Sequence, residues 1–182
     1  MPAPTARGAV TLVLGGARSG KSRFAEQLAA ASGLSLVYVA TASAHDDEMR
    51  ERIAHHRARR DDRWRTVDVL LDLAGALDAE TEPDRLVLVD CLTLWLTNVM
   101  LAGADIDAEI EALLVALSRV SGPVIAVSNE VGYGIVPDNA LARAFRDHQG
   151  RLNQRVAALS TRVTLVAAGL PLDLKLPKAP NE

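Results

Sequence analysis

Eight residues with the pattern G-x-x-x-x-G-K-S constrain this chain more than any other segment. They are Gly15, Gly16, Ala17, Arg18, Ser19, Gly20, Lys21 and Ser22. An apolar run at residues 10–14 precedes them, and apolar positions at helical spacing follow them as far as residue 31. A glycine-rich turn between a strand and a helix can wrap its backbone N–H groups around phosphate oxygens, and the helix N-terminus adds positive potential. The segment therefore predicts a phosphate-binding loop, or P-loop.

Two residues of this loop carry specific chemistry. Lys21 is expected to place its charge on the β- and γ-phosphates of a nucleotide, and the Ser22 hydroxyl is expected to bind Mg²⁺. The chain has 17 arginines and three lysines, and the other lysines, Lys175 and Lys178, lie near the C-terminus. A lysine here suits a site that needs a compact ammonium rather than a planar guanidinium. A chance glycine-rich turn is the alternative, and the flanking strand and helix argue against it.

The rest of the chain alternates apolar runs of strand length with helical patterns. Strands are expected at residues 10–14, 34–40, 64–69, 85–90, 123–128 and 162–168, with a proline-rich tail after the last. Helices are expected at 21–31, 46–60, 70–79, 92–101, 105–119 and 140–159. This alternation predicts an α/β fold with a mostly parallel sheet and helices on both faces. We expect a single domain over residues 10–175, a flexible N-terminal tail over 1–9 and a C-terminal tail over 176–182.

Composition excludes several classes of protein. The net charge of −3 over 182 residues argues against a general role in binding nucleic acids or membrane surfaces. Residues 86–104 approach the length of a membrane span, but polar residues interrupt them and a strand followed by a helix explains them better. The single cysteine, Cys91, cannot form an internal disulfide, and the chain does not begin with a secretory signal. We therefore expect a cytoplasmic protein with no nucleic-acid partner and no membrane span.

Two carboxylates end predicted strands. Residues 86–89 are apolar and place Asp90 at the C-terminal end of their strand, where a P-loop protein holds Mg²⁺ or its water shell. Capping of the helix that starts near Leu92 is the alternative role for Asp90. Asp68, at the end of the strand over residues 64–69, is a weaker candidate and is equally compatible with a surface position.

The predicted helix over residues 46–60 contains two adjacent histidines. At 100° per residue, Met49 and Ile53 form an apolar stripe, His56 falls about 60° from Ile53, and His55 falls on the polar face. One packed and one solvated histidine would be the ordinary interpretation. However, seven arginines lie between positions 50 and 65, which suits a solvated face, a surface for an acidic partner or a polyphosphate clamp. Such positive charges would lower the pKa of His55 and keep its imidazole neutral and nucleophilic.

Residues 128–137 form a glycine- and proline-bearing loop around Tyr133. The loop leaves the C-terminal end of a predicted strand, the edge at which ligands bind in such sheets. An ordinary connection is the alternative, and the sequence assigns no role to the loop.

Taken together, these segments resemble the bifunctional adenosylcobinamide kinase / adenosylcobinamide-phosphate guanylyltransferase family of cobalamin biosynthesis. The matching stretches are GGARSGKSRFAE, YVATA, DDEMRERIAHHRARR, WRTVD, VLVDCLTLWLTN and SNEVGYGIVPDNALARAFRDHQGRLNQRVA. They occur in the family's order from about residue 10 to residue 175. The P-loop is shared by many NTPases, whereas the histidine-containing stretch and NEVGYGIVP are far more specific.

The resemblance implies a RecA-like P-loop NTPase fold and two reactions. ATP or GTP would phosphorylate a hydroxyl of adenosylcobinamide, and GTP would then pass GMP to that phosphate through a guanylyl-histidine, with release of pyrophosphate. The position that matches this histidine is His55, and Lys21 would be the second catalytic residue. The match implies a nucleotide site formed by Gly15, Gly16, Ala17, Arg18, Ser19, Gly20, Lys21, Ser22, Thr41, Ala42, Ser43, His56, Arg57, Ala58, Arg59, Asp68 and Asp90. It also implies Mg²⁺ as cofactor, held by Ser22 and Asp90, and a homotrimer.

Two other functions stay open at this point. The chain could be a P-loop kinase of one small metabolite, in which both histidines are structural. It could also be a nucleotide-switch NTPase, although such switches usually carry a base-selective N-K-x-D motif that this sequence lacks.

Overall fold

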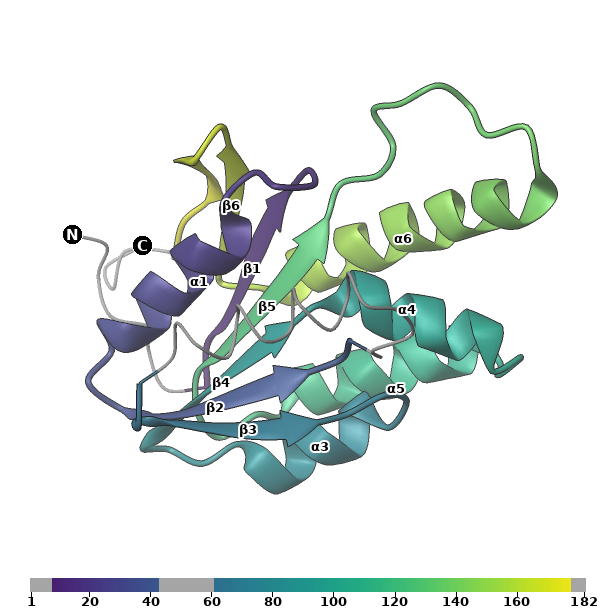
Figure 1. Cartoon of the computed structure of the whole chain (residues 1–182). Coiled ribbons are helices and arrows are strands. Elements are labelled where there is room, and N and C mark those ends of the chain that lie inside the picture. The colour runs from purple at the N-terminus through teal and green to yellow at the C-terminus, as the bar shows by residue number, and fades with distance from the viewer. Residues whose placement is uncertain (1–7, 43–60, 178–182) are drawn as a thin grey trace.

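The structure is a computed structural model that describes residues 8–42 and 61–177 (Figure 1). In this part of the chain, seven strands form one sheet in the order β3-β2-β4-β5-β1-β6-β7. The strands are β1 (Val10–Gly15), β2 (Ser35–Ala40), β3 (Trp64–Asp68), β4 (Arg85–Asp90), β5 (Val124–Asn129), β6 (Arg162–Ala167) and β7 (Leu170–Lys175). All neighbours pair in parallel except β6 and β7, which are antiparallel. The prediction of a mostly parallel sheet is confirmed.

Helices cover both faces of this sheet, also as predicted (Figure 1). The described helices are α1 (Lys21–Ala30), α3 (Leu73–Glu80), α4 (Leu92–Leu101), α5 (Ile106–Ser118) and α6 (Ala140–Leu159). Helix α1 packs on one face, and the other four pack on the opposite face. The helix expected over residues 46–60 lies outside the described residues. No helix within residues 8–42 and 61–177 is both long and apolar enough to cross a membrane.

Successive residues of the central strands contribute to two different cores. Leu12 of β1 packs with the face that carries α3 to α6, whereas the next residue, Val13, packs with the face beneath α1. Both side chains are fully buried. Since the side chains of a strand alternate between its two faces, a sheet with both faces covered needs continuous apolar strands, and this sequence supplies them.

The helix N-termini differ in how they are capped. Asp72, Asp105 and Asn139 accept backbone N–H hydrogen bonds at the starts of α3, α5 and α6. Helices α1 and α4 start directly behind the carboxyl ends of β1 and β4, and neither has a side-chain cap. The N-cap of α1 is a glycine and supplies no side-chain cap, and a helix N-terminus of this kind suits binding of an anion.

The expectation of a proline-rich tail after residue 168 is wrong, because a seventh strand, β7, follows β6 there. Residues 170–175 pair antiparallel with β6 at the edge of the sheet. Pro171 lacks an N–H donor, and an edge strand tolerates this because one side of it makes no ladder hydrogen bonds. The contacts that fix β7 come from polar residues: Arg162 donates to Asp173 at 2.9 Å, and Lys175 donates to the Ala157 carbonyl at 3.0 Å.

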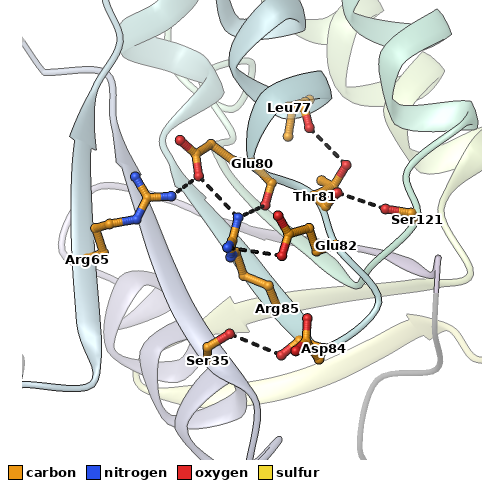
Figure 2. Close-up of polar contacts among 9 residues, drawn as sticks. All are labelled: Ser35, Arg65, Leu77, Glu80, Thr81, Glu82, Asp84, Arg85 and Ser121. Atoms are coloured by element: carbon orange, nitrogen blue, oxygen red, sulfur yellow. Dashed lines mark hydrogen bonds and ion pairs between the residues drawn. The ribbon is translucent and has the colours of Figure 1, made fainter.

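A cluster of polar contacts secures the amino edge of the sheet (Figure 2). Arg85 at the start of β4 donates to the Glu80 carbonyl at 3.2 Å and pairs with Glu82 at 3.0 Å, while Arg65 of β3 pairs with Glu80. Ser121, just before β5, donates to the Thr81 carbonyl at 2.8 Å. The amino ends of the strands are thereby tied to α3, and the predicted site residues lie at the opposite edge.

Candidate nucleotide-binding site

The carboxyl ends of the parallel strands bring the predicted residues into one row. Gly15, the first residue of the P-loop, is the register partner of Asn129 at the end of β5. One strand further, Asp90 ends β4 and is paired with Ala40, which in turn is paired with Asp68 at the end of β3. Only β5 therefore separates the P-loop strand from the strand that carries Asp90.

The P-loop makes a tight turn between β1 and α1. Arg18 (φ 56°) and Gly20 (φ 95°) have left-handed backbone conformations, and Gly20 forms the N-cap of α1. A side chain at Gly15 would bring its Cβ within 2.6 Å of the Val166 carbonyl oxygen and into contact with Ser19. These positions explain why the loop needs glycine at both ends.

Lys21 points back into its own loop. The residue is 6% exposed, and its Nζ donates to the Gly16 carbonyl at 3.1 Å. Ser22 follows in the first turn of α1 and is half-buried. The Ser19 carbonyl accepts from the Gly169 N–H at 2.8 Å, which ties the loop to the β6–β7 turn. The ammonium of Lys21 and the N-terminus of α1 therefore belong to the same loop, and both stabilise negative charge.

Asp90 is oriented by a tyrosine that the sequence analysis missed. Tyr38 of β2 donates its hydroxyl hydrogen to Asp90 Oδ2 at 3.1 Å. Tyr38 and Leu88 are register partners in the core beneath α1, so Asp90, two residues after Leu88, lies on the face of α1. Helix α4 has Cys91 as its N-cap and no side-chain cap, so the alternative role of Asp90 as a helix cap is not observed. The sequence signal for this contact was the hydroxyl of Tyr38, which stands within the otherwise apolar run of β2.

The ends of β2 and β4 are fastened together beside Asp90. Thr41 is fully buried, and its hydroxyl donates to the Cys91 carbonyl at 2.7 Å and accepts from the Cys91 N–H at 2.8 Å. Asn98 of α4 donates to the Thr41 carbonyl at 2.9 Å. The Thr41 hydroxyl is thus bonded to backbone in this structure. Contact of nucleotide with Thr41 and with the half-buried Ala42 stays a prediction.

The pKa of the Cys91 thiol responds to two charged site residues: Lys21, the predicted phosphate ligand, and Asp90, the predicted metal ligand. The pKa of the Cys91 thiol is raised to about 11, first by burial and second by the charge of Asp90, while the charge of Lys21 opposes the shift. The thiol therefore stays protonated at neutral pH. Both charges are therefore close enough to the Cys91 thiol to affect its pKa.

Part of the predicted site cannot be located in the structure. Ser43, His55, His56, Arg57, Ala58 and Arg59 lie outside the described residues. Asp68 is placed at the exposed end of β3, with β2 between it and the strand of Asp90. Its contact with nucleotide stays a prediction.

A P-loop between a buried strand and an uncapped helix, with a carboxylate at the end of a nearby parallel strand, defines a P-loop NTPase. Solved structures share this mostly parallel α/β fold. The flagellar accessory protein FlaH from Methanocaldococcus jannaschii is similar with a TM-score of 0.56 and 13% identity, over 98% of this chain and 83% of that one. A Pyrococcus horikoshii OT3 protein gives 0.59 and 10% identity, over 95% and 89%. At these identities the similarity shows the fold alone.

Sequence comparison identifies the family. The model for cobinamide kinase / cobinamide phosphate guanyltransferase matches residues 11–174, and the chain belongs to this family. It is 54% identical to the bifunctional adenosylcobalamin biosynthesis protein CobP of Pseudomonas aeruginosa, over 90% of this chain and 96% of that protein. It is 43% identical to the corresponding protein CobU of Escherichia coli K12, over 90% and 98%.

Proposed function

We propose that the chain phosphorylates adenosylcobinamide with ATP or GTP and then transfers GMP from GTP to the new phosphate, forming adenosylcobinamide-GDP and pyrophosphate. The observation that carries this proposal is the family match over residues 11–174, which includes the complete P-loop. The proposed substrates are small molecules, and the proposed place of action is the cytoplasm, where a reduced Cys91 is expected.

The kinase half needs positioning and charge stabilisation rather than covalent catalysis. The P-loop amides and the N-terminus of α1 would hold the β- and γ-phosphates, while Lys21 neutralises charge that develops between them. A phosphate in the loop would compete with the Gly16 carbonyl for the Lys21 ammonium. The 3.1 Å contact between these two groups therefore marks the position from which Lys21 would turn to the nucleotide.

The guanylyl transfer is proposed to proceed in two steps through His55. An imidazole nitrogen would form a bond to the α-phosphorus of GTP, the bond from that phosphorus to the α,β-bridging oxygen would break, and pyrophosphate would leave. A phosphate oxygen of adenosylcobinamide phosphate would then attack the same phosphorus and release the histidine. Support comes from the family resemblance at His55 and from its position on the polar face of the predicted helix.

The oxygen groups at the site fit Mg²⁺. The Ser22 hydroxyl stands in the first turn of α1, and the Asp90 carboxylate lies on the sheet face that α1 covers and is oriented by Tyr38. Magnesium prefers oxygen ligands of this kind, with nucleotide phosphates and water as the remainder. Bound there, it would neutralise charge on the phosphate oxygens of the leaving group. We propose that Ser22 and Asp90 hold this ion.

Asp90→Asn should lower the Mg²⁺-dependent rates of both reactions by roughly 10- to 100-fold while leaving the fold intact. The substitution keeps the shape of the side chain and removes its charge. Turnover at several Mg²⁺ concentrations, with thermal unfolding of the same samples, is the measurement. Asp84→Asn at the amino edge of the sheet is the matched control and should stay near wild type. Loss of thermal stability with normal activity per folded molecule would instead assign a structural role to Asp90.

The three functions left open by the sequence give different products in one assay. The protein is incubated with adenosylcobinamide, ATP and α-labelled GTP, and both the corrinoid products and the denatured protein are examined. The bifunctional enzyme gives adenosylcobinamide phosphate, adenosylcobinamide-GDP and an acid-labile, alkali-stable label on the protein. A kinase alone gives the phosphate without protein label, and a nucleotide switch gives only hydrolysed nucleotide.

We also propose that the chain works as a homotrimer. The family resemblance supports this, and the exposed leucines Leu170, Leu172 and Leu174 give edge strand β7 an apolar surface that a subunit contact would cover. Sedimentation equilibrium should give about three times the 19.4 kDa of one chain. Substitution of Leu172, which is 59% exposed, by aspartate should lower that mass if β7 lies in the contact. A monomeric wild-type protein would contradict the proposal.

A further inference from the structure

Asn129 occupies a central position at the nucleotide-binding edge, although the sequence analysis gave it no role. It is the last residue of β5, which lies between the P-loop strand β1 and the Asp90 strand β4. Ile125 and Val127 pack in the core beneath α1, so alternation along β5 places the Asn129 side chain on the same face. Asp90 lies on this face too. Asn129 is therefore placed between the predicted metal ligand and the P-loop.

The backbone at Asn129 is fixed by three hydrogen bonds. The Asn129 N–H donates to the Thr93 hydroxyl at 2.8 Å, and its carbonyl accepts from Asn153 Nδ2 at 3.0 Å. The next N–H, of Glu130, donates to the Gly15 carbonyl at 3.1 Å and so joins this strand end to the start of the P-loop. A side chain on such a backbone is held at a constant position relative to the P-loop.

A buried polar network behind the sheet supports the same strand end. Ser128 donates to Asn153 Oδ1 at 2.7 Å, and Gln149 Nε2 donates to the Ser128 hydroxyl and to Asn153 Oδ1, both at 2.9 Å. Ser128 and Gln149 are fully buried. Burial of polar groups is unfavourable unless they are hydrogen-bonded, and the bonds among Ser128, Gln149 Nε2 and Asn153 hold the end of β5 in one geometry.

The side-chain oxygen of Asn129 is buried and has no hydrogen-bond donor. Two other atoms in the described residues are in the same state: Ser19 Oγ, within the P-loop, and Gln149 Oε1, in the buried network behind the sheet. Leaving a buried acceptor unpaired costs about 1–3 kcal/mol, and such groups are rare in folded proteins. Asn129 Oδ1 differs from Gln149 Oε1 because it lies beside the phosphate-binding loop, where a bound ligand could supply the donor.

We propose that Asn129 Oδ1 accepts a hydrogen bond from the hydroxyl of the alcohol substrate and holds it in line with the γ-phosphate during phosphoryl transfer. Phosphate oxygens carry no hydrogen to donate, whereas the reacting alcohol does. In this step the hydroxyl oxygen forms a bond to the γ-phosphorus, and the bond to the β,γ-bridging oxygen breaks. The nucleoside diphosphate leaves, and the hydroxyl proton passes to an oxygen of the transferred phosphate. The inference rests on the proposed kinase function.

The test compares Asn129→Leu, which removes the acceptor, with Asn129→Asp, which keeps an oxygen at the same position. Kinase turnover with adenosylcobinamide and ATP, protein labelling from α-labelled GTP, and thermal unfolding are measured for each. Asn129→Leu should lower the kinase kcat by about 10²-fold, because a hydroxyl that is no longer oriented reacts more slowly. Labelling should stay near wild type, since that step uses the α-phosphate and no alcohol. Asn129→Asp should retain more kinase activity than Asn129→Leu. Gln154→Leu, on the exposed side of α6, is the control for loss of an amide.

Three results would overturn the inference. A kinase rate lower in Asn129→Asp than in Asn129→Leu would mean that the amide donates to a phosphate instead. Equal losses of kinase activity and labelling would assign Asn129 to a shared task, such as binding of a Mg²⁺-coordinated water. Normal kinase activity in Asn129→Leu would exclude any role for its oxygen. A wild-type protein that does not phosphorylate adenosylcobinamide would instead refute the proposed function, and this inference with it.

Discussion

Lys21→Ala should lower both the kinase and the guanylyltransferase rates by a factor on the order of 10³. Lys21 is the P-loop lysine and is 6% exposed. Its Nζ donates to the Gly16 carbonyl oxygen at 3.1 Å, inside the loop. In the kinase step, negative charge builds up on the oxygen between the β- and γ-phosphates. In the guanylyl step, it builds up on the departing pyrophosphate. One ammonium in the loop stabilises both, so its removal should impair both reactions together.

Two further lysine substitutions sharpen this prediction. Lys175→Ala removes a surface lysine whose Nζ donates to the carbonyls of Ala157 and Ala158, and it should leave both rates unchanged. Lys21→Arg keeps the charge but replaces the compact ammonium with a planar guanidinium, and it should restore little activity. Single-turnover rates at saturating nucleotide separate an effect on chemistry from weaker binding. Near-normal turnover in Lys21→Ala would exclude the phosphate-stabilising role.

The features predicted from sequence are those that depend on local order in the chain. The P-loop was predictable because the strand, glycine turn and helix N-terminus are consecutive. Asp90 was predictable because an apolar strand runs directly into it. The continuous apolar strands likewise indicated a parallel sheet covered on both faces, as observed. By contrast, strand β7 was missed. Its leucines alternate as in a strand, but the segment is only six residues long and contains and precedes prolines, which are typical of a tail.

The features that were missed depend on contacts between distant segments. The Tyr38 contact with Asp90 spans 52 positions, and the Thr41 contacts with Cys91 span 50. Neither has a signal in the local sequence beyond a polar residue within or after an apolar strand. The position of Asn129 beside both the P-loop and Asp90 depends on β5 lying between β1 and β4. Alternation of strands and helices does not determine that order.

The second large effect concerns His55, which lies outside the described residues and whose role stays a prediction. His55→Ala should abolish GMP labelling of the protein and lower adenosylcobinamide-GDP formation by a factor on the order of 10³ or more. Phosphorylation of adenosylcobinamide should continue, because the groups proposed for that reaction are Lys21, Ser22, Asp90 and Asn129. The measurement uses α-labelled GTP with preformed adenosylcobinamide phosphate, and the kinase step is assayed separately with ATP.

His56→Ala is the matched control for the neighbouring imidazole. On the helical wheel, His56 falls beside the apolar stripe of Met49 and Ile53, so we expect its ring to pack or to contact nucleotide rather than to carry GMP. This variant should still accept label from GTP, although weaker GTP binding would raise the concentration required. Labelling retained in His55→Ala but lost in His56→Ala would move the covalent role to His56. Normal labelling in both variants would place GMP on another residue. A wild-type protein that forms adenosylcobinamide-GDP without ever carrying label would favour direct transfer, in which the phosphate of the corrinoid attacks the α-phosphorus of GTP in one step.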